Sequence, residues 1–285
     1  MAIAVIPSGK VLGADVEGID CSQSLAKEIV DRVKRAWAGN LVLRFRGQRL
    51  TDEQLMNFSA NFGVLDKAPI AAAKRDQAKE TGYVGIISNI KVNGIVIGAL
   101  GHYESLWHTD MSYNDEPPIA SLLYSIEIPP TGGDTGFANQ YIAYERLPEA
   151  TKDRIAKLRL KHDSSLNSVG ELRRGFREVT DPRETPGAVH PIVRKHPVTR
   201  RSALYLGRRR NGYIIGLPLA ESEMLLDELW TAATADDLTW YQQWRVGDLI
   251  IWDNRCTLHR RDAFDESSRR LMHRTQITGE RVLAT

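Results

Sequence analysis

The sequence predicts a fold of mixed α and β class, and two patterns together with the composition point to it. Within the first 63 residues, an amphipathic helix, an alternating strand and a second amphipathic helix follow one another. The region 248–278 instead contains short apolar and alternating runs of strand length. The 285 residues are 42% hydrophobic and 26% charged, as in ordinary globular proteins, and this length can bury a large core. Length alone leaves open one large domain or two small ones.

The first helix is predicted over 24–38, because its apolar residues recur every four positions. These residues are Leu25, Ile29, Val33 and Trp37. Ser24 is a candidate N-cap, and Gly39 is a candidate stop. The following residues, 40–47, alternate with a period of two, which predicts a half-buried strand. Its two faces are Leu41, Leu43 and Phe45 on one side and Val42, Arg44 and Arg46 on the other.

The second helix begins with a capping box formed by Thr51 and Gln54. Its apolar stripe consists of Leu55, Phe58 and Phe62. Gly63 supplies the stop signal. From 64 to 105 the sequence becomes small, polar and rich in glycine. An irregular segment of this length in a compact domain predicts a functional lid or binding loop, the first lid segment.

The rest of the chain contains two more predicted helices, near 148–158 and near 221–233. Between them, 163–188 is polar and charged and predicts a second mobile excursion, the second lid segment. The apolar run 248–254 predicts a short buried strand, and 269–278 predicts an alternating one. The chain therefore passes from helices and strands at its N-terminus to strands at its C-terminus.

Net charge and cysteine content indicate the expected class of binding partner and the expected cellular compartment. The formal net charge of +2 lacks the basic excess that nucleic-acid or membrane binding usually requires, so a small molecule is the expected partner. Cys21 and Cys256 form no C-x-x-C motif, and the N-terminus lacks a basic region followed by a longer apolar run. The most apolar stretch, 86–101, is interrupted by polar residues and cannot form a membrane span of about 20 apolar residues. We therefore expect a reduced cytoplasmic protein.

A candidate metal site begins with His108 and Asp110, which are two residues apart in the string LWHTDMSY. On a strand this spacing places both side chains on one face, as a shared metal ion requires. His259 follows the predicted strand 248–254, and a loop there could bring a third ligand to the pair. Two histidines and one carboxylate are the ligand set of many non-haem Fe(II) oxygenases. A zinc-dependent hydrolase uses the same ligand types, so both classes stay open at this point.

A candidate anion site lies near the C-terminus. Arg270, Met272 and Arg274 share one face of the predicted strand, without obvious acidic neighbours there. Two guanidinium groups on one face indicate bound anions. The turn 131–135 adds a hydroxyl at Thr135 that could donate a hydrogen bond to a carboxylate. The arginines favour an oxygenase with a keto-acid cosubstrate, because a hydrolase needs no second anion site.

Five strings in one order resemble a known family. They are WHTD (107–110), TGGDT (131–135), HPIVRKHP (190–197), IIWDNRCTLH (250–259) and RRLMHRTQITG (269–279). With this order and spacing, the chain resembles the taurine and aryloxyalkanoate dioxygenases, the TauD/TfdA-like family of Fe(II)- and 2-oxoglutarate-dependent enzymes. The resemblance implies a double-stranded β-helix, a cupin-like jelly roll, with flanking helices. It also implies a single domain over 1–285 and a homo-oligomer, either a dimer or a tetramer.

The resemblance implies a role for each candidate residue. The implied iron ligands are His108, Asp110 and His259. Arg270 is implied to hold the distal carboxylate of 2-oxoglutarate with Thr135 as a helper, and Arg274 to bind the anionic group of the prime substrate. The implied reaction uses O2 to hydroxylate a small organic anion, a sulfonate or a carboxylate, and releases succinate and CO2. Asp110 favours hydroxylation over chlorination, because related halogenating enzymes carry a small residue there.

The expected substrate pocket departs from that of the taurine enzymes. Glu104 stands where they carry an asparagine, and Arg210, in the run RRRNGY, stands near where they carry an aromatic residue. Both residues predict a more polar pocket and a substrate with groups beyond one anion. The other arginines of the run, Arg208 and Arg209, are expected on a solvated or subunit-contact face. A zinc-dependent hydrolase with the same three ligands remains the alternative function.

Overall fold

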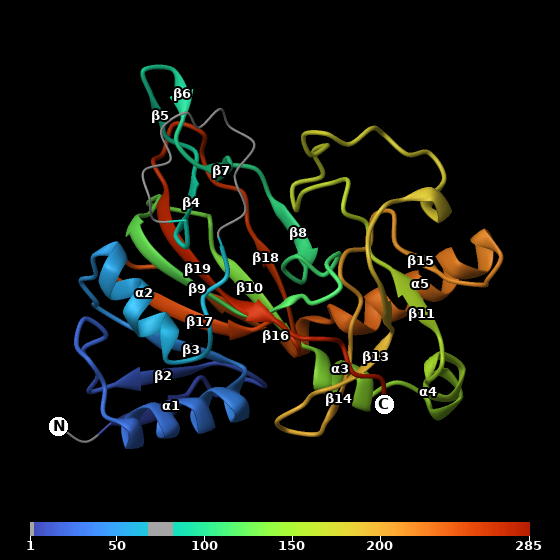
Figure 1. The fold of residues 1–285 in the computed structure, drawn as a ribbon, viewed down its shortest axis with the longest axis horizontal. Helices are drawn as coiled ribbons and strands as arrows, with labels where there is room; N and C mark the ends of the chain where they lie inside the picture. The colour runs from blue at the N-terminus through green and yellow to red at the C-terminus, as the bar shows by residue number, and fades with distance from the viewer. Residues whose placement is uncertain (1–2, 68–81) are drawn as a thin grey trace.

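Two β-sheets face each other in the computed structural model, which describes residues 3–67 and 82–285 (Figure 1). The large sheet contains, in spatial order, β1 (Ala4–Pro7), β2 (Ala14–Glu17), β3 (Val42–Phe45), β17 (Leu249–Asp253), β9 (Pro118–Glu127), β19 (Leu271–Gly279), β4 (Gly85–Ser88) and β7 (Ala99–Leu100). The small sheet contains β16 (Thr239–Gln242), β10 (Thr135–Asn139), β18 (Thr257–Arg261) and β8 (Ser105–His108). Helices cover the outer faces of both sheets, so the predicted mixed α and β class is confirmed.

The space between the sheets is filled by side chains from both of them. Ile250 and Trp252 of β17 point inward from the large sheet, and Phe137 of β10 points inward from the small sheet. The rings of Phe137 and Trp252 lie 5.5 Å apart. Because side chains alternate along a strand, every second residue of β18 and β19 also enters this space. The polar residues among them form the candidate site.

Two helices cover the outer face of the large sheet (Figure 1). They are α1 (Lys27–Asn40) and α2 (Asp52–Ala60). Phe58 of α2 packs there with Leu43 and Phe45 of β3, and the rings of Phe58 and Phe45 lie 5.2 Å apart. The predicted capping box is confirmed, since the Thr51 hydroxyl accepts from the Gln54 amide and the Gln54 side chain accepts from the Thr51 amide. The stripe of α2 thus docks this helix on the sheet.

The ends of α1 differ from the prediction. The helix begins later than predicted, with Ala26 rather than Ser24 at the N-cap position and no side-chain cap. It continues past Gly39 and ends where Leu41 adopts the left-handed conformation, with φ of 64°. Leu41 then packs between the sheets on the same side as Val42, because the left-handed residue interrupts the period of two. The predicted alternation therefore holds only from Val42 onward.

A third layer covers the outer face of the small sheet. Its helices are α3 (Gln140–Glu145), α4 (Glu149–Ile155) and α5 (Leu219–Ala233), with 3-10 turns at Pro182–Glu184 and Asp236–Leu238. Its short strands are β11 (Arg159–Lys161), β12 (Val189–Pro191), β13 (Val193–Lys195), β14 (Ser202–Leu204) and β15 (Tyr213–Ile214). Leu225 of α5 shares a core with Ala138 and Leu258 of the small sheet. The helices predicted near 148–158 and 221–233 are confirmed.

The first lid segment, 64–105, is only partly irregular. Residues 68–81 lie outside the described residues, but the rest includes β4, β7 and a hairpin of β5 (Lys91–Val92) and β6 (Ile95–Val96). β4 pairs with β19, so the expectation of an irregular segment is wrong there. The four residues of β4 are too few for the sequence to display a period. The second lid segment, 163–188, is irregular apart from one 3-10 turn.

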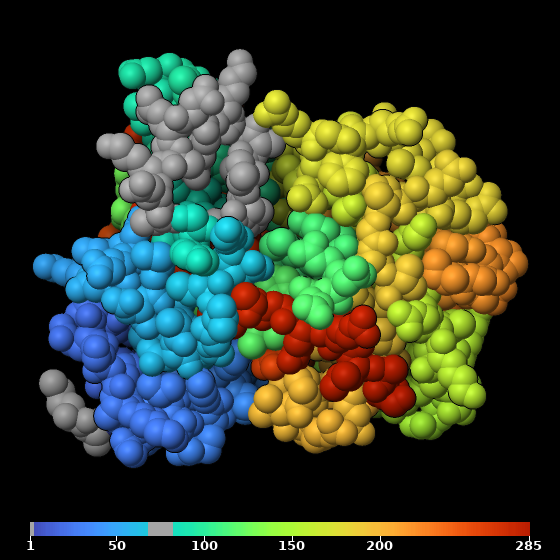
Figure 2. Space-filling view, viewed as in Figure 1, coloured from blue at the N-terminus to red at the C-terminus, as the bar shows by residue number. Residues whose placement is uncertain are grey.

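The C-terminal residues lie on the molecular surface beside the β13–β14 hairpin (Figure 2). The Lys195 amide donates to the Leu283 carbonyl over 2.8 Å, and Arg194 forms a bridge with Ala284. Within the described part of the chain, no helix has the length and apolar character that a membrane span needs.

Candidate active site

The three predicted ligands converge at the end of β8. His259 pairs with His108 across β18 and β8, and their imidazole rings lie 4.1 Å apart. His259 is therefore on a strand, and the prediction of a loop position is wrong. Asp110 lies in the turn after β8, so this turn rather than strand alternation returns its carboxylate to the histidines. Asp110 Oδ1 lies 3.9 Å from His108 Nε2 and 3.8 Å from His259 Nε2.

The environment of the two imidazoles leaves nitrogen atoms for a metal ion. His108 Nδ1 lies 2.7 Å from the Leu106 carbonyl oxygen, and donation to it leaves the lone pair on Nε2. His259 Nδ1 is buried and has no hydrogen-bond partner within the described residues. One ligand atom each from His108, Asp110 and His259 lies within 4.8 Å of the others. This donor set fits a divalent metal ion that keeps open coordination positions.

The second oxygen of Asp110 is held by a chain of buried hydrogen bonds. Ser121 of β9 lies 2.7 Å from Asp110 Oδ2 and donates to it. Asn254 and Gln276 donate to Ser121 Oγ over 3.1 and 3.3 Å, so the serine hydrogen is directed at the carboxylate. Trp252 donates to the Asn254 side-chain oxygen and fixes the orientation of that amide. Outer contacts of this kind orient a metal ligand, and they leave Oδ1 facing the histidines.

The protonation states also suit a metal ion. Burial lowers the pKa of His108 well below its usual value, and the neighbouring His259 lowers it further. Burial also lowers the pKa of His259 to about 4. Burial by itself would raise the pKa of Asp110, but Arg274 and the two histidines hold it below its usual range. At neutral pH the site presents two neutral imidazoles and one carboxylate, the forms that bind metals.

We expect the metal-free protein to lose stability as the pH falls from about 6.5 to about 4. The unfolded chain takes up protons on its histidines near pH 6.5, whereas folded His259 stays neutral down to about 4. The unfolded state therefore binds more protons in this range, and His259 alone lowers the free energy of unfolding by about 3 kcal/mol at pH 4. Urea unfolding at several pH values measures the effect. His259→Leu is expected to flatten the dependence, and an identical slope would contradict this account.

A buried guanidinium lies in the same inter-sheet space. Arg270 is 1% exposed, and its Nε and Nη1 atoms have no hydrogen-bond partner in the described structure. Burial lowers the pKa of Arg270, Arg261 lowers it further, and Asp134 partly offsets both. Arg261 donates to the carbonyl oxygens of Leu100 and Tyr103, and burial lowers its pKa to about 10. Neither cation has a carboxylate partner among the described residues, and two such neighbouring buried cations fit a bound anion.

Thr135 lies at the start of β10, opposite Arg261 in the strand register. Its hydroxyl oxygen accepts from Trp244 Nε1 over 3.0 Å, so its own hydrogen is left to donate elsewhere. The turn that precedes Thr135 packs against Arg270, because a Cβ atom built on Gly133 would lie 3.5 Å from Arg270 Nε. A carboxylate held by the arginines would thus also have a hydroxyl donor on the adjoining strand. Arg270, Arg261 and Thr135 together form an anion clamp, which fits the distal carboxylate of a keto diacid.

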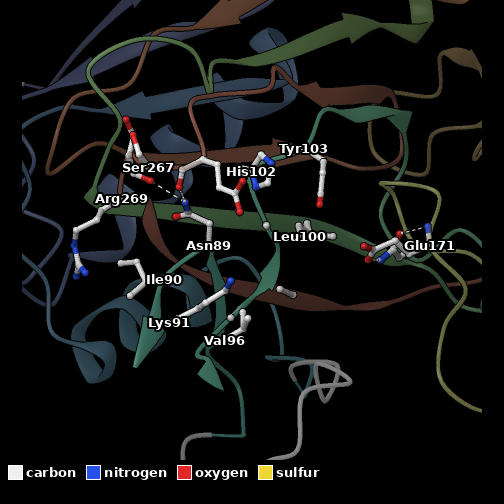
Figure 3. Close-up of a pocket in the computed structure, with 16 residues that line it drawn as sticks. Asn89, Ile90, Lys91, Val96, Leu100, His102, Tyr103, Glu171, Ser267 and Arg269 are labelled. Atoms are coloured by element: carbon white, nitrogen blue, oxygen red, sulfur yellow. Dashed lines mark hydrogen bonds between the residues drawn. The ribbon is translucent and has the colours of Figure 1, made fainter. Parts of the chain in front are cut away.

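The two lid segments meet beside this clamp, at a pocket of about 570 Å³ shown in Figure 3. Asn89 lines it and accepts from the Arg270 amide over 3.0 Å, while its own amide donates to the Ser268 carbonyl over 2.7 Å. Tyr103 of the first segment and Glu171 of the second line the same pocket (Figure 3). Asn89, which directly follows β4, therefore ties the end of β4 to Ser268 and Arg270 in the residues before β19.

The structure treats the three predicted substrate residues differently. It brings Arg274 to the site, where Nη1 lies 3.3 Å from Asp110 Oδ1. Glu104 is instead half-exposed and paired with Arg260 over 2.6 Å, on the outer side of the small sheet. Arg210 is exposed and has no carboxylate partner among the described residues. The predicted position of Glu104 in the pocket is therefore not supported by its ion pair. Arg210, although exposed, lines a cavity beside His108, so its position in the pocket stays a prediction.

A second cluster with metal-binding residue types is already saturated. His196, Asp253 and Cys256 lie within 4.8 Å of one another. Asp253 accepts from His196 Nε2 over 3.1 Å and from both ends of the Arg255 guanidinium. His196 Nδ1 accepts from two backbone amides, so neither ring nitrogen is available. His196 therefore holds the Asp253 carboxylate and the following turn in place.

The sequence analysis missed two residues of this region and placed a third, Arg208, in the wrong environment. Arg261 is two residues beyond His259, and a strand at 257–261 would have placed both on one face. Ser121 carries no pattern of its own, because its role depends on the approach of Asp110 from another part of the chain. Arg208 was expected on a solvated or subunit-contact face, but its Nε is buried. Of the three residues, only Arg261 could have been found from its spacing in the sequence.

Comparisons with known proteins agree with this site. The model of the family described as "Taurine catabolism dioxygenase TauD, TfdA family" matches residues 4–276. The alpha-ketoglutarate-dependent 2,4-dichlorophenoxyacetate dioxygenase of Cupriavidus pinatubonensis is 33% identical over 99% of this chain and 100% of its own. The alpha-ketoglutarate-dependent sulfate ester dioxygenase of Pseudomonas putida is 30% identical over 98% of this chain and 91% of its own. The crystal structure of AAD-2 in complex with Mn(II) and N-oxalylglycine matches with a TM-score of 0.82 at 32% identity and covers 100% of both chains.

The fold, the converging ligands and these matches define a class, the 2-oxoglutarate-dependent dioxygenases, to which this protein belongs. Within that class, the chain is a member of the TauD/TfdA family, as its five sequence strings predicted. The names of the relatives specify different substrates, a chlorinated phenoxyacetate for one and sulfate esters for another. Family membership therefore leaves the prime substrate to be argued from the site.

Proposed function

We propose that the protein is an Fe(II)- and 2-oxoglutarate-dependent dioxygenase that hydroxylates a small organic anion, a carboxylate or a sulfonate. One O2, one 2-oxoglutarate and one substrate C–H bond give the hydroxylated product, succinate and CO2. The observation that carries the proposal is the buried, unpaired guanidinium of Arg270 in the same inter-sheet space as the His108, Asp110 and His259 ligand set. A metal site and an anion clamp together fit a chelating keto diacid.

In this proposal the side chains bind and orient the reactants. The metal ligands are His108, Asp110 and His259, and the metal with its chelated keto acid supplies the activation of O2. Arg270 and Thr135 hold the distal carboxylate, which fixes how the keto acid approaches the metal. Arg274 lies 3.3 Å from Asp110 Oδ1, so it positions the Asp110 carboxylate and faces the bound substrate.

The alternative function is a zinc-dependent hydrolase with the same three ligands. It would leave Arg270 and Arg261 without a role, because hydrolysis at one metal needs no dicarboxylate cosubstrate. Buried guanidinium groups without counter-ions destabilise a fold, so their presence favours a function that supplies the anion.

The test is an anaerobic titration of the metal-free protein with Fe(II) and then 2-oxoglutarate. We expect a weak visible charge-transfer band that requires both additions, followed on admission of O2 by succinate equal to the 2-oxoglutarate consumed. Zn(II) in place of Fe(II) is the matched control and should give neither signal. Absence of the band with Fe(II), together with tight Zn(II) binding and hydrolytic activity, would favour the hydrolase instead.

We also propose the finer features that the family resemblance implies. The two facing sheets are taken as a double-stranded β-helix, with residues 1–285 as one domain and with the two lid segments as its movable parts. The two buried, unpaired cysteines are compatible with a reducing cytoplasm. A homo-oligomer, a dimer or a tetramer, is proposed for its assembly, and sedimentation equilibrium measures it directly.

A further inference from the structure

Arg208 lies beside the metal ligands, in the segment that runs along the end of β8. Its backbone forms a bridge with His108, and the Thr109 amide donates to the Gly207 carbonyl over 2.9 Å. These contacts fix the backbone of Arg208 next to the first ligand. The side chain donates from Nη1 to the Leu166 carbonyl over 2.6 Å.

The remaining donors of Arg208 are not neutralised. Its Nε is buried without a hydrogen-bond partner, and no carboxylate of the described residues lies within 4.0 Å of the guanidinium. The group lies 5.7 Å from the ring centre of Tyr113, and Arg173 lies 4.5 Å from the same ring. Burial lowers the pKa of Arg208, although Tyr113 and Asp110 offset part of this effect. The region therefore carries excess positive charge next to the metal ligands.

The other arginines of the same run differ in this respect. Arg209 is paired with Glu223 and Asp227 of α5, each over 2.7 Å. Arg210 is exposed, and its Nη1 donates to the Gly170 carbonyl over 3.4 Å. Of the three consecutive arginines, Arg208 is thus the one that keeps a buried, unpaired donor atom. A buried cation without a counter-ion is unfavourable, so a site of this kind is built for an anion that binds.

A cavity of about 300 Å³ adjoins Arg208 and His108. Its apolar walls are Leu106, Trp107, Leu166 and Trp230. A space of this volume is at the small end of ligand pockets and suits a single ring or a short branched chain. Arg209, Arg210 and Asp163 also line the cavity, and the Asp163 carboxylate accepts from the Ser165 amide and the Asn211 side chain. The cavity thus combines apolar walls with the buried, unpaired donor of Arg208 at the side of the metal ligands.

We propose that Arg208 binds the anionic group of the prime substrate together with Arg274, while the apolar body of the substrate occupies the cavity. Arg274 Nη1 lies 3.3 Å from Asp110 Oδ1, and the backbone of Arg208 pairs with that of His108, so both arginines lie beside the ligand set. The substrate class is an organic carboxylate or sulfonate whose apolar body is about the size of one ring. This inference rests on the proposed function and adds Arg208 to the substrate-binding residues.

The test measures binding rather than turnover. Protein loaded with Mn(II) and 2-oxoglutarate is titrated calorimetrically, in the absence of O2, with phenoxyacetate, benzenesulfonate and the neutral ether methoxybenzene. Arg208→Met is expected to weaken binding of the better anion by about 30-fold or more and to leave methoxybenzene within about twofold. Arg208→Lys, which keeps the charge, should recover part of the loss. Trp107 and Trp230 provide a second readout through their fluorescence.

Arg174→Met is the matched control, because it removes the same charge at an exposed position of the second lid segment that does not line the cavity. Equal losses in Arg208→Met and Arg174→Met would overturn the proposal in favour of general electrostatic attraction. Unchanged anion binding in Arg208→Met, or no binding of either anion by the wild type, would also overturn it. If Arg208→Met fails to fold, the comparison of Arg208→Lys with the wild type decides. The Fe(II) and 2-oxoglutarate band needs no substrate, so it separates failure of this inference from failure of the proposed function.

Discussion

Replacing Arg270 with methionine is expected to weaken 2-oxoglutarate binding by about 100-fold. The guanidinium is 1% exposed, so a carboxylate that it binds forms a buried, charge-assisted pair. Loss of one partner from such a pair costs about 2 to 5 kcal/mol, and every 1.4 kcal/mol is a factor of ten. Anaerobic titration of the Fe(II)-loaded variant with 2-oxoglutarate measures the change. Stability of the metal-free variant should not fall, because the removed charge had no partner.

Arg269→Gln is the matched control for this substitution. Arg269 is adjacent in sequence, but its side chain is exposed and paired with Glu127 over 2.7 Å. The Arg269→Gln variant should therefore bind 2-oxoglutarate as the wild type does. Arg270→Lys should recover only part of the affinity, since an ammonium cannot form the two parallel hydrogen bonds of a guanidinium. Affinity within threefold of wild type in Arg270→Met would show that the distal carboxylate is held elsewhere.

Substitution of His259 by leucine is expected to lower metal affinity by at least about 100-fold and to abolish turnover. At neutral pH the same change should leave the metal-free fold as stable as before, because His259 Nδ1 has no hydrogen-bond partner within the described residues. Calorimetric titration with Mn(II) measures the affinity, and urea unfolding measures the stability. Replacement of a metal ligand is thus expected to abolish function without loss of stability.

His196→Leu is expected to give the opposite result. Both ring nitrogens of His196 are hydrogen-bonded, one of them to the buried carboxylate of Asp253. The substitution should lower the free energy of unfolding by about 3 kcal/mol while metal affinity stays unchanged. Retained metal affinity in His259→Leu, or its loss in folded His196→Leu, would mean that the metal site is wrongly assigned.

Local sequence patterns predicted the elements whose structure depends on neighbours in the chain. The capping box of Thr51 and Gln54 needs only contacts three residues apart, and it is present as predicted. The alternation of β19 also follows from strand geometry, so His273 turns outward to Asp52 while Arg274 faces Asp110. β4 and the true start of α1 were missed, because four residues display no period and a capping residue need not be used.

The sequence by itself determined the family and the types of ligand, since residue identity and order along the chain are enough for both. Only the tertiary structure decided which charges remain unpaired. Glu104 and Arg260 neutralise each other, whereas Arg208 and Arg270 keep buried donor atoms that have no partner among the described residues. Chain position cannot reveal this difference, because it depends on which distant side chains the fold brings within hydrogen-bond distance. Burial then makes an unpaired charge unfavourable until an anion binds.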